Sequence, residues 1–169
     1  MQDIPVPDDA ELTRRVTVLA GQLLDRRWRM ATAESCTGGW IAKCCTDLAG
    51  SSNWFERGLV TYSNRAKHEL LGVDQETLAR DGAVSRATAL QMADGARRRA
   101  AVDVALAVTG IAGPEGCSDD KPVGTVWFAW SLGDRPADSE RRVFAGDREA
   151  VRRQTVACAL QGLIDRLVP

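Results

Sequence analysis

The sequence predicts an α/β fold, a three-layer α-β-α domain built on a mixed, mostly parallel sheet. Helical and strand-like patterns alternate through the early part of the chain, which is typical of crossover connections between parallel strands. Two glycine-rich loops each follow an apolar run, and two more strand-like runs further on form a predicted hairpin. A length of 169 residues fits one domain with a substantial core, so residues 1–169 are interpreted as a single domain with a flexible leader over residues 1–8.

Capping residues and apolar spacing define the elements expected in the first half of the chain. Asp8 or Asp9 can cap a first helix whose apolar residues recur every three or four positions up to Leu23. Asn64 is a good cap for a short helix that Gly72 stops. In order, we expect the first helix ending near 26–27, a strand over 28–33, a helix over 39–48, a strand over 58–62, the short helix, and a helical turn over 75–80.

The second half of the chain contains the apolar run expected at the centre of the sheet. Residues 102–108 are almost uninterruptedly apolar, which is typical of a strand covered on both faces. In order, we expect a helix from Ser85 through the arginines at 97–99, this central strand, two strands over 123–132 and 141–144 joined by a turn at 133–136, and a last helix capped by Asp147.

Composition and charge exclude several classes of function. The formal charge of -1 and the pI near 5.9 argue against a nucleic-acid binder that relies on bulk electrostatics. No apolar stretch is long enough to span a bilayer and the N-terminus lacks a signal peptide's basic start, so we expect a cytoplasmic protein without membrane contacts. Five cysteines without a Cys-x-x-Cys pair, and a single histidine, indicate neither a disulfide framework nor a metal site.

Three loops are expected to meet at the carboxyl edge of the sheet, where ligands collect in folds of this class. These loops span residues 35–39, 62–67 and 109–116. Their common location favours a binding or catalytic site over three unrelated turns.

The turn after the first strand carries a candidate nucleophile, Ser35. Backbone N–H groups at a helix start point outward and favour negative charge, so those of Thr37, Gly38 and Gly39 are candidates for binding an oxyanion. A serine in such a place can attack a substrate if a neighbouring base takes its proton. The alternative is that Ser35 or Thr37 only caps the following helix.

Lys67 is the candidate base, because the chain has three lysines and draws its ordinary positive charge from arginine. At the third position of the helix capped by Asn64, the positive end of the helix dipole would lower the pKa of its ammonium. Tyr62, the only tyrosine, ends the preceding strand and can complete a constellation with Ser35 and Lys67. The alternatives are that Lys67 is a solvated lysine at a helix start and that Tyr62 is a half-buried aromatic residue of a strand. His68 is a competing base, but it points about 100° around the helix from Lys67.

Cys36 and Arg148 are further candidates for the site. Cys36 competes with Ser35 as nucleophile. Adjacent side chains at a turn diverge, so only one of the two can act as the nucleophile. The loop 109–116 matches neither a phosphate-binding P-loop nor a dinucleotide fingerprint, so it indicates only a close approach of backbone to another group. Arg148, at the start of the last helix, would suit a phosphate because guanidinium and helix N–H groups act together. The alternative is that Arg148 is an ordinary exposed arginine at the start of a helix.

Several blocks of this sequence resemble the C-terminal domain of the competence-damage-inducible CinA proteins. The resemblance spans residues 12–167, and the blocks follow one another in the family's order, which makes it specific. The blocks are 33–39 (AESCTGG), 50–52 (GSS), 62–67 (YSNRAK), 82–85 (GAVS), 110–114 (GIAGP), 121–126 (KPVGTV) and 146–148 (GDR).

The resemblance implies an amidohydrolase that converts nicotinamide mononucleotide to nicotinate mononucleotide and ammonia, within pyridine nucleotide salvage. It implies a catalytic site of Ser35, Lys67 and Tyr62, with neither a metal nor a cofactor. The residues expected to bind the substrate are Thr37, Gly38, Gly39, Thr109, Gly110 and Arg148.

The sequence also raises expectations about the partners of the protein and about alternative functions. A homo-oligomer is expected, and Trp54, Trp127 and Trp130 are candidates for its interface. The main alternative to an enzyme is a non-enzymatic interaction domain tied to competence or DNA-repair partners. A third interpretation is a nicotinamidase-like hydrolase that uses Cys36.

Overall fold

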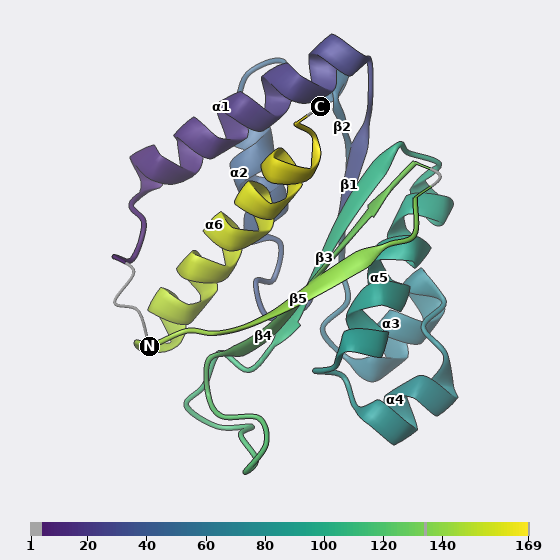
Figure 1. The fold of residues 1–169 in the computed structure, drawn as a ribbon, viewed down its shortest axis with the longest axis vertical. Helices are drawn as coiled ribbons and strands as arrows, with labels where there is room; N and C mark the ends of the chain where they lie inside the picture. Colours follow the sequence, from purple (N-terminus) through teal and green to yellow (C-terminus); the bar gives the residue numbers. More distant parts are fainter. Residues whose placement is uncertain (1–4, 134, 169) are drawn as a thin grey trace.

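A computed structural model describes residues 5–133 and 135–168, and it has the three layers that the sequence predicts (Figure 1). The elements are α1 Asp9–Arg26, β1 Met30–Glu34, α2 Trp40–Asp47, η1 Ser51–Asn53, β2 Phe55–Val60, α3 Asn64–Leu71, α4 Gln75–Asp81, α5 Arg86–Ala100, β3 Val104–Gly110, β4 Thr125–Leu132, β5 Asp138–Val143 and α6 Arg148–Arg166. The predicted leader falls partly on residues 1–4, which lie outside the described residues.

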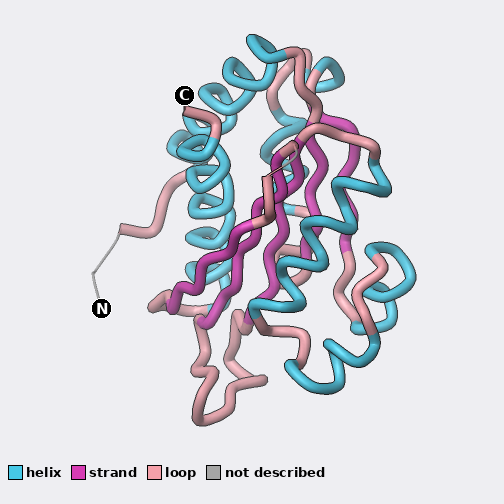
Figure 2. The backbone as a smooth tube through the Cα atoms, turned by 45° about the vertical axis from the view of Figure 1, so that its right-hand side comes forward, coloured by secondary structure: helices cyan, strands magenta, loops and turns pink. Residues whose placement is uncertain are grey.

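The sheet is mixed, with the strand order β2-β1-β3-β4-β5. β1 pairs in parallel with β2 and β3, whereas β4 is antiparallel to both β3 and β5, so β4 alone runs against the other four strands. Helices α1, α2 and α6 cover one face, and α5 covers the other with α3 and α4 packed beside it (Figure 2). The carboxyl ends of β1, β2 and β3 therefore lie at one edge.

The central strand β3 is buried on both faces, which explains its unbroken apolar run. Val104, Leu106 and Val108 belong to the core shared with α1, α2 and α6. Ala105 and Ala107, which alternate with them, belong to the core beneath α5. The small alanine side chains let α5 approach the sheet closely.

Several predicted boundaries are displaced from the observed ones. Ser63, not Asn64, caps α3, because its backbone is extended and its hydroxyl accepts the N–H of Ala66 at 3.0 Å. Lys67 is therefore the fourth residue of α3 and not the third. The strands predicted at 58–62 and 141–144 begin earlier, as β2 and β5. Both are exposed edge strands rich in polar residues, so hydrophobicity did not mark their first residues.

The tryptophans expected at an interface have another role, with one exception. Trp54 and Trp130 are each 1% exposed and belong to the core, so the interface prediction is wrong for both. Trp130 fits because Gly162 has no side chain: a Cβ there would overlap the indole ring. Of these three tryptophans, Trp127 is the one that is partly exposed. Among the described residues, no helix is long and apolar enough to cross a membrane.

Candidate active site

The three loops expected at the carboxyl edge of the sheet line a single cavity of about 240 Å³. Ser35 and Cys36 enter it from the turn after β1, and Tyr62 and Lys67 from the segment after β2. The end of β3 supplies residues 109–110, and the loop after it supplies residues 111–113 and 115–116. Ala83, Val84 and Arg148 complete the lining. The loops lie together because the carboxyl ends of the parallel strands β1, β2 and β3 meet at one edge of the sheet.

Ser35 and Lys67 are in direct contact at the floor of this cavity. The Lys67 Nζ lies 2.9 Å from the Ser35 Oγ and also donates to the carbonyl oxygens of Thr61 at 2.8 Å and Tyr62 at 3.3 Å. Lys67 is 1% exposed, and within the described residues it forms no ion pair. Burial lowers the pKa of Lys67 to about 8, because a desolvated ammonium loses its hydration without gaining a carboxylate.

His68 does not compete for this place. Its side chain is exposed and does not line this cavity, and the ring Nδ1 lies 2.8 Å from the carbonyl oxygen of Val73. The 100° step between consecutive helical residues separates it from Lys67, as expected.

The turn that carries Ser35 is held by a buried carboxylate, which the sequence analysis missed. Glu34 is 0% exposed and accepts the hydroxyl of Thr37 at 2.7 Å and the N–H groups of Ile41 and Ala42 at 2.9 Å each. Glu34 thus satisfies the start of α2, while Gly39 occupies the N-cap position with φ 98°. Neither Ser35 nor Thr37 caps this helix, and the Ser35 hydroxyl contacts the amine of Lys67 instead.

Thr37, Gly38 and Gly39 do not line the cavity, although they were expected to bind the substrate. The N–H of Gly38 donates to the Ser35 carbonyl oxygen at 3.1 Å and is thereby occupied. Within the part of the chain that is described, the N–H groups of Cys36 and Thr37 have no hydrogen-bond acceptor. Of the three expected oxyanion donors, Gly38 is thus occupied, whereas the N–H groups of Thr37 and Gly39 have no acceptor among the described residues, and that of Cys36 is an additional donor.

Cys36 is poorly suited to nucleophilic attack. Its side chain is 6% exposed, and burial raises the pKa of its thiol to about 12. The reactive thiolate is scarce under such conditions. The geometry therefore favours Ser35, which has the amine of Lys67 beside it.

Tyr62 and Arg148 lie together at the rim of the cavity. The Tyr62 side chain is 63% exposed, and its hydroxyl accepts a hydrogen bond from the Arg148 Nη2 at 3.2 Å. Arg148 is the first residue of α6, as predicted, and its Nη1 donates to the Gly113 carbonyl oxygen at 2.8 Å. Tyr62 contacts Lys67 through its main-chain oxygen, so its phenol is not beside the candidate base.

Thr109 and Gly110 line the cavity and also have structural roles. The Thr109 hydroxyl donates to the Ala83 carbonyl oxygen at 2.8 Å and so joins the end of β3 to the segment before α5. Gly110 leaves no room for a side chain, because a Cβ there would lie 2.7 Å from the Val126 Cγ2.

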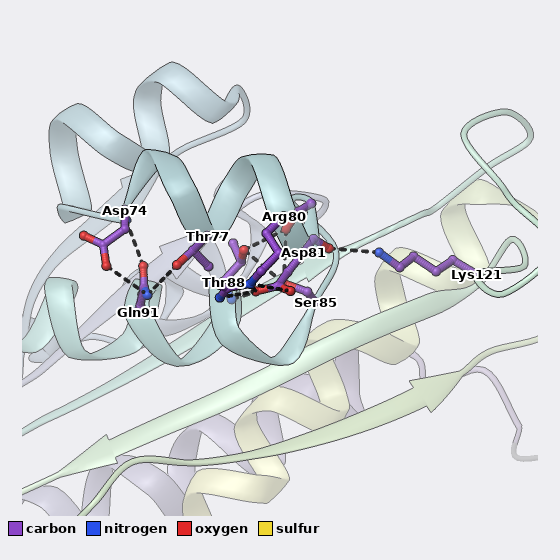
Figure 3. A network of polar contacts seen from close by, with 9 residues as sticks. Asp74, Thr77, Arg80, Asp81, Ser85, Thr88, Gln91 and Lys121 are labelled. Atoms are coloured by element: carbon purple, nitrogen blue, oxygen red, sulfur yellow. Dashed lines mark hydrogen bonds and ion pairs between the residues drawn. The ribbon is translucent and has the colours of Figure 1, made fainter.

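A polar network outside the cavity supports its wall (Figure 3). The hydroxyls of Ser85 and Thr88 donate to the Gly82 carbonyl oxygen at 3.1 and 2.7 Å, which fixes the segment containing Ala83 and Val84. The Lys121 Nζ reaches from the long loop between β3 and β4 to the Asp81 carbonyl oxygen at 3.1 Å. The loop that contributes residues 111–113 and 115–116 to the cavity is thereby tied to the end of α4, close to Ala83 and Val84. Among the described residues, no group of three or more His, Cys, Asp or Glu side chains could hold a metal ion.

The fold and this site define a member of the CinA C-terminal domain family, to which the chain belongs: the family model matches residues 13–167. The chain is 53% identical over 155 residues to a protein of Escherichia coli (strain K12) named nicotinamide-nucleotide amidohydrolase PncC, with 92% of this chain and 94% of the relative covered. A protein of Pseudomonas putida with the same name is 52% identical over 153 residues, covering 88% of this chain and 95% of the relative.

Solved structures support the same family. The structure of the competence/damage inducible protein CihA from Agrobacterium tumefaciens matches with a TM-score of 0.87 and 46% identity, covering 96% of this chain and 98% of that one. The competence damage-inducible protein A of Klebsiella pneumoniae gives a TM-score of 0.89 and 42% identity, with 92% and 96% covered. The family resemblance and the fold class that the sequence suggested are both confirmed.

Proposed function

We propose that this protein is a nicotinamide-nucleotide amidohydrolase that converts nicotinamide mononucleotide and water to nicotinate mononucleotide and ammonia. The contact of 2.9 Å between the buried amine of Lys67 and the hydroxyl of Ser35 carries the mechanistic part of this proposal. The choice of substrate is supported by the names of relatives that are 53% and 52% identical to this chain over nearly their whole length. We assign the reaction to pyridine nucleotide salvage, since it returns a nicotinamide compound as its acid.

Burial without a carboxylate partner favours the neutral amine of Lys67 over the ammonium, and its hydrogen-bond partners accommodate the neutral form. Two of its three partners, the carbonyl oxygens of Thr61 and Tyr62, can only accept hydrogen bonds. In the neutral amine, two N–H groups donate to these oxygens, and the lone pair is left facing Ser35. The hydroxyl of Ser35 then donates to Nζ, which is the geometry a general base requires.

The reaction proceeds through an acyl-enzyme. The Ser35 Oγ forms a bond to the carboxamide carbon while its proton passes to the Lys67 Nζ, giving a tetrahedral oxyanion. As the C–N bond breaks, the Lys67 ammonium returns that proton to the leaving nitrogen and ammonia departs. Water then attacks the ester with Lys67 again as base, and collapse releases the nicotinate group and restores the Ser35 hydroxyl.

Backbone N–H groups of the turn stabilise the oxyanion in this scheme. Those of Cys36 and Thr37 have no acceptor within the described residues, so either can donate to the developing charge. One such donor contributes about 3 kcal/mol to transition-state stabilisation in other hydrolases.

Arg148 binds the substrate phosphate in this proposal. It lies at the cavity rim, where its guanidinium and the N–H groups at the start of α6 present positive charge on one side. The phenol of Tyr62 orients this guanidinium through the hydrogen bond at 3.2 Å. Tyr62 therefore supports substrate binding more directly than proton transfer.

Release of ammonia from nicotinamide mononucleotide by the pure protein tests the proposal, with Ser35→Ala and Cys36→Ala as a matched pair. We expect Ser35→Ala to lose turnover. Cys36→Ala keeps the backbone N–H and removes only a protonated thiol, so it should retain most of the turnover. No ammonia from the parent protein would favour a non-enzymatic interaction domain. Activity on free nicotinamide that disappears in Cys36→Ala would instead favour the nicotinamidase-like alternative.

A further inference from the structure

A second arginine of α6, Arg152, reaches the turn that carries the nucleophile. Its Nε donates to the carbonyl oxygen of Cys36 at 3.0 Å, and its Nη2 donates to that of Thr37 at 3.0 Å. A planar guanidinium presents parallel N–H groups, so it fits two consecutive carbonyls better than any other side chain. We propose that Arg152 is a positioning residue that fixes the peptide planes of this turn for the reaction of Ser35. The inference rests on the proposed function.

The contacts of Arg152 determine where N–H groups of the turn point. In a trans peptide the N–H lies opposite the C=O of the same plane. Because Arg152 holds the carbonyl of Cys36, the N–H of Thr37 must point away from α6. Because it also holds the carbonyl of Thr37, the N–H of Gly38 points away too, and this group donates to the Ser35 carbonyl oxygen at 3.1 Å. One side chain thus orients two successive peptide planes directly and a third, that of Ser35, through Gly38.

The turn needs such an anchor because its glycines leave it free to rearrange. Gly38 and Gly39 have φ values of 60° and 98°, a region in which glycine exchanges readily between conformations. Glu34 holds other atoms, namely the hydroxyl of Thr37 and the N–H groups at the start of α2. Among the described residues, Arg152 is the side chain that bonds to the carbonyls of Cys36 and Thr37.

The neighbouring residue provides a matched control. The guanidinium carbons of Arg152 and Arg153 lie 5.2 and 4.9 Å from the centre of the Trp40 ring, so both pack against the same aromatic side chain. Arg153 forms ion pairs with Asp9 and Glu149 and has no bond to the turn. The two arginines therefore carry the same charge and pack on the same ring, but they differ in their polar partners, which are the Ser35 turn for Arg152 and two surface carboxylates for Arg153.

Steady-state kinetics of Arg152→Met and Arg153→Met on nicotinamide mononucleotide test the inference. We expect kcat of Arg152→Met to fall about a hundredfold with little change in KM, as when reacting groups are displaced by about 1 Å. Arg153→Met should keep its kcat, while the melting temperatures of both variants fall by similar amounts. Guanidinium ion added at millimolar concentration should restore activity to Arg152→Ala and leave Arg153→Ala unaffected.

Labelling of Ser35 by a fluorophosphonate separates this inference from the choice of substrate. The rate of labelling depends on activation of the hydroxyl, so Arg152→Met should react more slowly than the parent and Arg153→Met at the parent rate. If the parent is labelled at Ser35 but does not hydrolyse the nucleotide, the proposed substrate is refuted. The labelling rates of the parent and Arg152→Met then still test the role of Arg152. Equal kcat and labelling in parent and Arg152→Met would overturn the inference, as would a parent whose Ser35 is not labelled.

Discussion

The protonation state of Lys67 controls the proposed reaction, because only the neutral amine can take the Ser35 proton. Burial lowers its pKa from 10.5 to about 8. The neutral fraction is therefore about one tenth near pH 7, one half near pH 8 and nine tenths near pH 9. An exposed lysine would be about three-hundredfold less available as a base near pH 7.

The pH dependence of kcat/KM follows from these fractions. We expect kcat/KM for nicotinamide mononucleotide to rise about tenfold per pH unit below about pH 7 and to become constant above about pH 9. A single ionisation with a midpoint near pH 8 should describe the curve. The rise should be the same with any substrate that reacts through Ser35, since the titrating group belongs to the free protein.

NMR of protein labelled with ¹³Cε-lysine assigns this midpoint to a residue. The chain has three lysines, Lys43, Lys67 and Lys121, so few signals need to be assigned. The hydrogen bond to Asp47 raises the pKa of Lys43, which separates it from Lys67. The signal that disappears in Lys67→Met should titrate near pH 8 in the parent.

Two results would refute the reasoning. A kcat/KM that is flat or falls between about pH 7 and pH 9 would mean that no buried amine acts as base. A Lys67 signal that titrates near 10.5 would mean that burial does not neutralise this side chain. The variant Ser35→Ala serves as a control, because its Lys67 should still titrate well below 10.5 while activity is absent.

The remaining predictions concern stability and substrate binding. Between about pH 8 and about pH 10.5 the unfolded chain binds more protons at Lys67 than the folded one, so the free energy of unfolding should rise with pH. Urea denaturation should detect this rise in the parent and not in Lys67→Met; equal slopes would contradict it. Glu34→Gln should lose about 2 kcal/mol of unfolding free energy, because an amide cannot accept from the N–H groups of both Ile41 and Ala42, and an unchanged urea midpoint would be the opposing result. Arg148→Met should raise KM for nicotinamide mononucleotide about tenfold and leave KM for nicotinamide riboside, which lacks the phosphate, unaltered; an equal rise for both would exclude phosphate binding.

Local patterns in the sequence predicted the parts of the fold and site that depend on neighbouring residues. The strand, glycine turn and helix around Ser35 follow from hydrophobic spacing and from the conformations that glycine permits. The start of α6 at Arg148 follows from the capping residue Asp147, whose carboxylate accepts the N–H of Ala150 at 2.9 Å. The meeting of the three loops follows from the parallel pairing of β1 with β2 and β3.

Contacts between distant residues could not be predicted in this way. Glu34 reaches the N–H of Ile41 seven residues on, beyond the range in which an N-cap side chain is usually sought. Arg152 lies 116 residues from Cys36 in the chain, so no local spacing relates them. The phenol of Tyr62 turns toward Arg148, which depends on how α6 docks. The one local signal for Glu34 is its place as an acid shortly before a helix start, since carboxylates stabilise helix starts.

The position of α6 has a consequence for how this protein comes into being. Ser35 and Lys67 both precede residue 68, whereas Arg148 and Arg152 belong to the helix made last among the described elements. That helix also buries Val151, Val156 and Leu160 against the sheet. A nascent polypeptide still lacking α6 therefore contains the proposed nucleophile and base without the helix that completes their surroundings, and we expect hydrolysis only once residues 148–166 have been added. For the same reason, a synthetic peptide spanning residues 148–166 is a natural candidate for switching on a shortened enzyme by complementation.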